Sequence, residues 1–265
     1  MELTDGRSSQ APRDLLSAWR AEETGQPQGW DFSRLAGRMT ETAESWNLDK
    51  IWRDAINLSR HVLDMGTGGG EFLRRFASVL PSDTVATEGW PPNVPVATAA
   101  LEPYGVTVVQ HDPDTDIYLP FLDGRFDLVL NRHEAFRADE VARVLSPGGV
   151  FLTQQVGGNE MAELHAVTGH HAPHPEVTLK HCRDQLEAAG LEILDEGESR
   201  GWYAFDDVAA LVAYLQLVPW DVPDDFSVDR YPGSLWQLHQ RGPARGEPVR
   251  LSRVRFWVRA RKPLT

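Results

Sequence analysis

The stretch VLDMGTGGGEFLRRF, residues 62–76, constrains this chain more than any other, because four of its five central residues are glycine. An apolar run precedes the glycines and an amphipathic run follows them, as expected for a buried strand that turns sharply into a helix. A turn without side chains exposes backbone N–H groups at a helix N-terminus, where a ligand can approach closely. The stretch therefore predicts a ligand-binding turn after the first strand.

Spacing separates the ligand classes that use such a turn. A phosphate-binding P-loop has Lys and then Ser or Thr after its last glycine, whereas Glu71 and Phe72 follow here. A dinucleotide fingerprint counted from Gly66 reaches Glu71 at its sixth position, where a carboxylate would repel a pyrophosphate. What remains is an acidic residue followed by alternate glycines: Asp64, Gly66, Gly68 and Gly70.

Apolar and amphipathic runs alternate along the rest of the chain. Strands are expected at 61–66, 84–89, 106–112, 126–131, 150–157, 191–200 and 250–262. Helical patterns cover 12–59 and recur at 71–80, 93–105, 138–149, 179–190 and 205–218. This alternation predicts an α/β fold, a doubly wound and mostly parallel sheet with helices on both faces. In such a sheet, ligands bind beyond the carboxyl ends of the strands.

The glycine turn and the strand ends that follow it resemble the class I S-adenosylmethionine-dependent methyltransferases. The resemblance covers about residues 63–155 and includes VATEGW, VVQHDP, FDLVLN and EVARVLSPGGVFL. It implies that the turn holds the methionine part of S-adenosyl-L-methionine, that Glu88 accepts hydrogen bonds from the ribose and that Asp112 lies near the adenine. S-adenosyl-L-homocysteine would be the product. The implied cofactor-binding residues are Asp64, Gly66, Thr67, Gly68, Gly70, Glu88, Asp112 and Asn131.

The resemblance also implies a seven-stranded sheet with an antiparallel last strand. Four parts are expected: a tail and helical cap (1–59), the cofactor-binding Rossmann-like core (60–200), an insertion over the acceptor site (201–248) and the last strand (249–265). The sequence RLSRVRFWVRARK would form that strand, and we expect its arginines to be exposed.

The segment LNRHEAF after the fourth strand faces the transferred methyl group in this family. Methyl transfer requires alignment of the reactants and, where the nucleophile carries a proton, a general base. The catalytic candidates are Asn131, as a hydrogen-bond partner, and His133 and Glu134, as bases. Arg132 could bind an anionic substrate through two parallel hydrogen bonds. A polar turn and helix cap would explain the same residues without catalysis.

The segment departs from several known subclasses. It lacks the Asn/Asp-Pro-Pro-Tyr/Phe sequence of amino-group DNA methyltransferases, a cysteine suited to cytosine methylation and the aspartate-rich pattern of metal-dependent catechol enzymes. It is similar to a less-characterised bacterial branch. Aromatic residues are frequent at 202–236 and in the N-terminal helices, where they either join cap to core or line a pocket. We expect a small apolar or aromatic acceptor, methylated on oxygen or nitrogen as in specialised metabolism.

Composition limits the partners. With 39 acidic and 26 basic residues the formal charge is −13, which opposes binding to nucleic acid and to anionic membranes. Cys182 is the single cysteine, and the histidines between 165 and 181 lack zinc-site spacing, so no metal is expected. No apolar run approaches the ~20 residues of a membrane span. The N-terminus has no signal-peptide layout, so a cytoplasmic location is expected, and the oligomeric state stays open.

Three other functions stay open. A nicotinamide-dependent oxidoreductase could use Glu88 for its ribose, although Glu71 and the antiparallel ending count against it. An rRNA or tRNA methyltransferase is disfavoured by the negative charge. A non-catalytic cofactor-binding protein would keep the fold with a blocked acceptor pocket.

Overall fold

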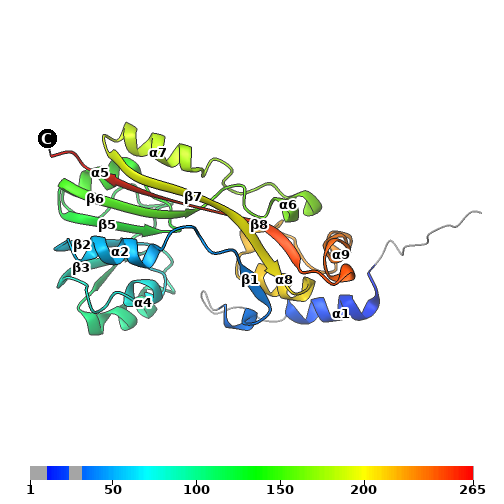
Figure 1. Cartoon of the computed structure of the whole chain (residues 1–265). Coiled ribbons are helices and arrows are strands. Elements are labelled where there is room, and N and C mark those ends of the chain that lie inside the picture. Colours follow the sequence, from blue (N-terminus) through cyan, green and yellow to red (C-terminus); the bar gives the residue numbers. More distant parts are fainter. Residues whose placement is uncertain (1–10, 24–31, 265) are drawn as a thin grey trace, which may run out of the picture. The chain divides into compact units, whose positions relative to one another are not determined.

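The computed structural model of the chain describes residues 11–23 and 32–264 (Figure 1). It consists of two compact units. The helical unit comprises Met1–Ala43, Gly158–Pro175 and Arg200–Arg253, and the sheet unit comprises Glu44–Gly157, Glu176–Ser199 and Val254–Thr265. The glycine turn belongs to the sheet unit.

In the described part of the chain, eight strands form one sheet in the order β1-β7-β8-β6-β5-β2-β3-β4. They are β1 (Met39–Glu41), β2 (His61–Met65), β3 (Asp83–Glu88), β4 (Thr107–Gln110), β5 (Phe126–Arg132), β6 (Leu145–Val156), β7 (Glu192–Phe205) and β8 (Val249–Arg261). The pairs β2–β3, β3–β4, β2–β5 and β5–β6 are parallel, whereas β6–β8 and β1–β7 are antiparallel. The α/β class, the mostly parallel sheet and the antiparallel last strand are therefore confirmed.

The strand order reverses beside β2. Strands β3 and β4 continue from β2 toward one edge, and β5 and β6 lie on its other side. Within the parallel pair, Met65 at the end of β2 is the register partner of Asn131 in β5. Side chains at the carboxyl ends of β2 and β5 therefore meet at a topological switch point, where ligands bind in folds of this kind.

Alternating side chains of the sheet are buried under helices on both faces. In β2, Val62 packs with Trp52 and Ile56 of helix α2 (Leu48–Ile56). The next residue, Leu63, packs on the opposite face with helices α5 (Ala138–Val144) and α7 (Leu179–Ala188). Since successive strand residues point to opposite faces, this near-continuous apolar run is what a parallel strand covered on both sides requires.

The remaining helices are short. In the sheet unit they are α3 (Glu71–Arg74) and α4 (Val94–Leu101), and in the helical unit α1 (Arg13–Glu22), α6 (Ala162–Thr168), α8 (Val208–Leu215) and α9 (Pro232–Arg241). Every residue of α8 is buried, and its contacts include α1 and α9. Among the described residues, no helix combines the length and the apolar character that crossing a membrane requires.

The expected count of seven strands was wrong. The additional strand, β1, lies inside the segment that was expected to be helical, and it pairs with the end of β7, Met39 opposite Phe205. Three residues are too few to produce a readable alternation, so only the partner strand reveals this one. Similarly, the helix expected at 138–149 ends at Val144, and Ser146–Gly149 belong to β6, where the register shifts.

The expected exposure of the arginines in the last strand holds for Arg250 and Arg261 but was wrong for two others. Arg253 and Arg255 of β8 are 4 % and 6 % exposed. The strand lies between β7 and β6 in the sheet order, and its two buried guanidinium groups have partners within the fold. Arg253 Nε donates to Glu41 at 3.0 Å and its guanidinium lies over the ring of Tyr203. Buried guanidinium groups of this kind require such partners.

Trp52 provides a test of the sheet packing. Its ring is 1 % exposed and lies 4.9 Å from Phe72 and 5.8 Å from Phe76, centroid to centroid. Trp52→Ala should lower the free energy of unfolding by about 3–5 kcal/mol, because it removes buried contacts and leaves a cavity. Urea denaturation measures the change, with Leu58→Ala, at a residue that is 88 % exposed, as the control. A loss below about 1 kcal/mol for Trp52→Ala would contradict this packing.

Candidate active site

Glycine is required in the turn by backbone conformation and by close packing. Gly66, Gly68 and Gly70 have φ values of 67°, 63° and 83°, a region in which residues with a side chain are strained. A Cβ added at Gly70 would lie 2.8 Å from Cγ of Leu101. The N–H of Thr67 donates to a carbonyl of β3 at 2.8 Å. The turn is thus fixed against the neighbouring strand, and its glycines allow other side chains to approach the backbone closely.

The Glu88 carboxylate fastens this turn to the end of β3. Its Oε2 accepts a hydrogen bond from the Gly68 N–H at 2.8 Å, and its Oε1 accepts one from the Trp90 N–H at 2.9 Å. Burial raises the pKa of this carboxyl group, and the hydrogen bonds from Trp90, Gly68 and Asn93 oppose that rise. A carboxylate has about four acceptor positions, so these three hydrogen bonds leave about one position for a ribose hydroxyl.

Asp112 lies next to the turn that follows Glu88. Its Cα is 3.1 Å from the position of a Cβ added at Gly89, so the segments after β3 and β4 are in close contact. The carboxylate of Asp112 accepts the N–H of Asp114 at 3.0 Å, and its own N–H donates to Asp116 at 3.0 Å. The tertiary structure therefore brings Asp112 to the same edge of the sheet as Glu88, inside a hydrogen-bonded turn.

Glu134 lies directly against the glycine turn. A Cβ added at Gly66 would lie 2.5 Å from Cβ and Cγ of Glu134 and 2.6 Å from its Oε2. Burial raises the pKa of the Glu134 carboxyl group to about 7, and the charges of Glu88, Asp114 and Asp112 add to the rise. Two carboxyl groups, Glu88 and Glu134, thus contact the turn, and the charges of Asp112 and Asp114 act on Glu134, which makes the surroundings attractive to a cation.

A buried amide network holds the segment that carries Glu134. Asn131 is fully buried, and its Oδ1 accepts hydrogen bonds from Thr153 Oγ1 at 2.8 Å and Gln155 Nε2 at 2.7 Å. Gln155 Nε2 also lies 3.0 Å from the backbone carbonyl of Glu134. Within the described chain, Asn131 Nδ2 has no partner. Asn131 therefore positions the segment through its oxygen and retains an unused donor.

Gln155 is a site residue that the sequence analysis missed. It belongs to TQQVG, in which polar residues interrupt an otherwise apolar strand. Thr153, Gln154 and Gln155 are all at most 9 % exposed. Buried polar side chains in consecutive strand positions need partners, and that unusual run was the available signal.

His133 follows β5 with a φ of 61°, which is uncommon outside glycine. Its N–H donates to the Gln154 carbonyl at 2.9 Å, and its Nε2 lies 3.3 Å from Gln154 Nε2. Because Gln154 Oε1 accepts from Trp46 Nε1 at 2.9 Å, the amide nitrogen of Gln154 is the donor toward His133. The imidazole nitrogen that faces Gln154 is therefore engaged as an acceptor.

Asp64 lies beneath the turn, 4 % exposed. Burial raises its pKa to about 7; the Arg132 charge opposes this rise, and the Glu88 charge adds to it. The structure thus gathers Asp64, Glu88, Asp112 and Glu134 around the glycines, as a site at this edge requires.

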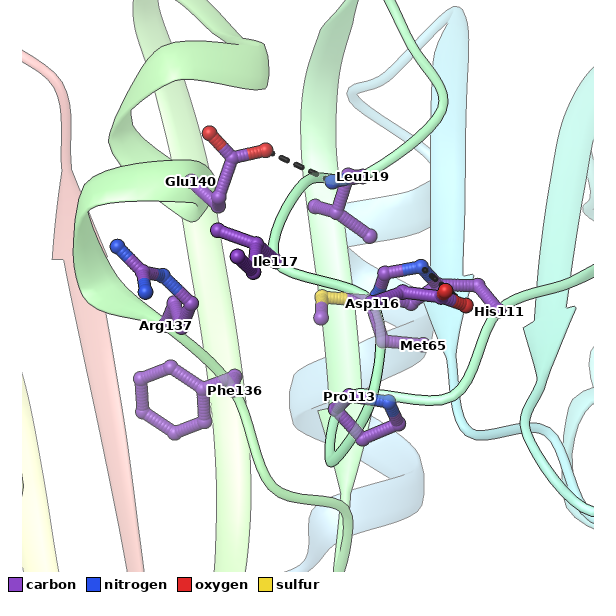
Figure 2. A pocket seen from close by; sticks show the side chains of 9 residues that line it. All are labelled: Met65, His111, Pro113, Asp116, Ile117, Leu119, Phe136, Arg137 and Glu140. Atoms are coloured by element: carbon purple, nitrogen blue, oxygen red, sulfur yellow. Dashed lines mark hydrogen bonds and ion pairs between the residues drawn. The ribbon is translucent and has the colours of Figure 1, made fainter.

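A small cavity adjoins this edge, and Figure 2 shows the side chains that line it. They come from the ends of β2, β4 and β5 and from the segments that follow: Met65, His111, Pro113, Asp116, Ile117, Leu119, Phe136, Arg137 and Glu140. The carboxylate of Glu140 accepts a hydrogen bond from the Leu119 N–H at 2.8 Å, which joins two segments that line the cavity. Its volume of about 10 Å³ is near the minimum for one water molecule. His111, 6 % exposed, is a lining residue that sequence reasoning did not select.

The histidine-rich segment belongs to the helical unit as far as residue 175. His165 Nε2 lies 3.7 Å from Asp221 Oδ1, and both side chains are largely buried. Among the described residues, no group of three or more His, Cys, Asp or Glu side chains is arranged to bind a metal. Burial raises the pKa of the Cys182 thiol to about 12, which keeps it protonated and unreactive at neutral pH.

A family model described as a methyltransferase domain matches residues 63–153. The match begins in β2, ends in β6, and includes the glycine turn, Glu88, Asp112 and the segment after β5. The chain contains a class I methyltransferase domain. A search among curated proteins found no match to the chain.

Solved structures share the fold of this chain. A putative methyltransferase from Bacillus halodurans is 21 % identical, with a TM-score of 0.58, over 82 % of this chain and 99 % of that one. A functionally unknown protein from Deinococcus radiodurans is 16 % identical, with a TM-score of 0.58, over 94 % and 98 %. The [4+2]-cyclase SpnF is 16 % identical, with a TM-score of 0.50, over 95 % and 94 %. At these identities the likeness concerns the fold alone.

The residues at the turn fit the methyl donor that the family uses. S-adenosylmethionine carries a positive sulfonium and an ammonium group, which the carboxylates of Glu134 and Glu88 would attract. The buried Asn131 Nδ2, which lacks an acceptor within the described residues, supplies a donor. No phosphate is present in this donor, so the acidic surroundings are no obstacle.

The raised pKa of Glu134 leads to a stability prediction. Its carboxyl group shifts from 4.5 to about 7 in the folded protein, so ionising it opposes folding as the pH rises between these values. Glu134→Gln should therefore raise the Tm at pH 8 and leave the Tm at pH 4 nearly unchanged. Scanning calorimetry at both values measures this, with the exposed Glu71→Gln as the control. An equal change at both pH values would contradict the shift.

Proposed function

We propose that this methyltransferase transfers the methyl group of S-adenosylmethionine to an oxygen or nitrogen of a small organic acceptor. The observation that supports this most directly is the contact of Glu88 with the Gly68 N–H at the switch point of a methyltransferase domain. The formal charge of −13 favours a small molecule over a nucleic acid as the acceptor.

In this proposal, different residues of the chain bind different parts of the cofactor. Gly66, Gly68 and Gly70 leave room for the methionine part, Glu88 accepts a ribose hydroxyl, and Asp112 accepts the adenine amino group. When bound, S-adenosylmethionine supplies a methyl group activated by a positive sulfur atom. The protein then has to exclude water, align the acceptor and, where needed, remove its proton.

Glu134 suits the removal of that proton better than His133. Its carboxylate lies against Gly66, and its pKa of about 7 lets it accept a proton near neutral pH. The His133 nitrogen that faces Gln154 already accepts a hydrogen bond. We therefore assign the base to Glu134 and the positioning of its segment to Asn131 and Gln155.

The cofactor assignment is tested by calorimetric titration of the purified protein with S-adenosylmethionine, S-adenosylhomocysteine and NAD. We expect binding of the first two and none of the third. Glu88→Ala should weaken the binding of S-adenosylmethionine at least tenfold, because it removes the hydrogen-bond acceptor for the ribose and leaves the Gly68 N–H without its acceptor. Glu71→Ala, at an exposed residue beside the same turn, is the control. Binding of NAD alone would replace the proposal with the oxidoreductase alternative.

The base assignment is tested by pH profiles of turnover, measured as formation of S-adenosylhomocysteine with an acceptor found by screening. Turnover should rise with pH through about 7, since Glu134 must be ionised to accept a proton. Glu134→Gln should lower kcat at least tenfold and abolish the rise of turnover with pH. His133→Ala should keep the wild-type kcat and the same rise. A large loss confined to His133→Ala would assign the base to the histidine instead.

A further inference from the structure

Arg132 carries a guanidinium group beside the glycine turn whose N–H donors have no partner among residues 11–23 and 32–264. It ends β5, and its side chain is exposed. The guanidinium carbon lies 4.5 Å from the centroid of the Phe72 ring, which holds the group in a defined orientation. In the described part of the chain, no hydrogen bond or ion pair is formed by this guanidinium. Its planar fork of donors is therefore oriented and unused.

Two other arginines act on Arg132 although the whole chain is acidic. Partial burial lowers the pKa of Arg132, and the charges of Arg255 and Arg75 lower it further. The charges of Asp64 and Glu44 act in the opposite direction, each with a smaller effect than either arginine. An anion placed at this position would relieve the repulsion among the arginines.

This positive group lies at the same edge of the sheet as the acidic turn. Leu130 of β5 is the register partner of Asp64 in β2, and Arg132 is two residues farther along on the same face. Two residues after Arg132, Glu134 lies against Gly66. The segment from 132 to 134 thus carries a guanidinium group and a carboxylate two residues apart. The guanidinium lies over Phe72, and the carboxylate lies against Gly66.

We propose that Arg132 binds an oxyanion, a carboxylate or phosphate group, of the methyl acceptor. The inference rests on the proposed function and specifies its acceptor as an anionic small molecule, with Phe72 offering an aromatic ring beside the anion. The methionine carboxylate of the cofactor is the other oxyanion at this site. The cofactor also carries an ammonium and a sulfonium group, so its net charge is positive and a group of arginines attracts it little. A methyl acceptor with a net negative charge has no such positive groups, so the arginines attract it more strongly than they attract the cofactor.

The test uses the full chain saturated with S-adenosylhomocysteine, so that the cofactor site is filled. Benzoate, phenyl phosphate and the neutral benzamide are titrated and followed by saturation-transfer NMR. We expect the wild-type protein to bind at least one of the two anions tenfold or more above benzamide. Arg132→Ala should reduce this preference to about twofold, and Arg132→Lys should retain part of it, because lysine keeps the charge without the planar fork.

Arg125→Ala is the matched control. Arg125 directly precedes β5 at its opposite end, and its guanidinium likewise lies over a phenylalanine, Phe126, at 5.0 Å. It already pairs with Asp83 at 2.5 Å, so it has a partner that Arg132 lacks. This variant should keep the preference for the anion.

Three outcomes would overturn the inference. One is a wild-type protein that prefers neither anion over benzamide, and another is a preference that survives in Arg132→Ala. The third is a tenfold loss of S-adenosylmethionine affinity in Arg132→Ala with unchanged anion binding, which would assign the guanidinium to the cofactor carboxylate. Failure of the wild-type protein to bind S-adenosylmethionine or S-adenosylhomocysteine is a different result, because it overturns the proposed function itself.

Discussion

The Glu88 carboxylate is the contact on which the candidate site depends. Its two oxygens accept hydrogen bonds, one from the Gly68 N–H and one from the Trp90 N–H. These charge-assisted hydrogen bonds join the turn after β2 to the end of β3. A turn built from glycines has no side chains with which to pack, so a partner outside the turn has to define its shape. Burying a carboxylate costs free energy, and these donors offset that cost.

His133 explains how charges of opposite sign come to face different sides of one turn. In a continued strand, Arg132 and Glu134 would point to the same face, because side chains alternate with a period of two. The positive φ of His133 ends that alternation. Arg132 remains over Phe72, and Glu134 turns against Gly66. Gln155 then holds the turned segment through its bond to the Glu134 carbonyl. Strained residues are frequent at functional sites, and here the strain has a structural consequence.

Local patterns were sufficient for much of the fold. The glycine turn, the strands β2 to β6 and the antiparallel β8 were all expected, because each has a run of apolar residues long enough to show its period. The failures had non-local causes. Strand β1 is defined by pairing with β7, and the burial of Arg253 and Arg255 depends on tertiary contacts such as that of Arg253 with Glu41. Neither fact is present in the local sequence.

The sequence by itself determined the class of the protein, because the spacing of Asp64, Gly66, Gly68 and Gly70 and the acidic ends of the following strands are read along one chain. Only the tertiary structure decided which side chains meet at the turn. It brought Glu134 against Gly66, connected Gln155 to Asn131 and placed the Arg132 guanidinium over the ring of Phe72. The physical reason is that parallel strands separated in sequence converge at their carboxyl ends. Contacts made there depend on register and on one left-handed residue, which no local pattern encodes.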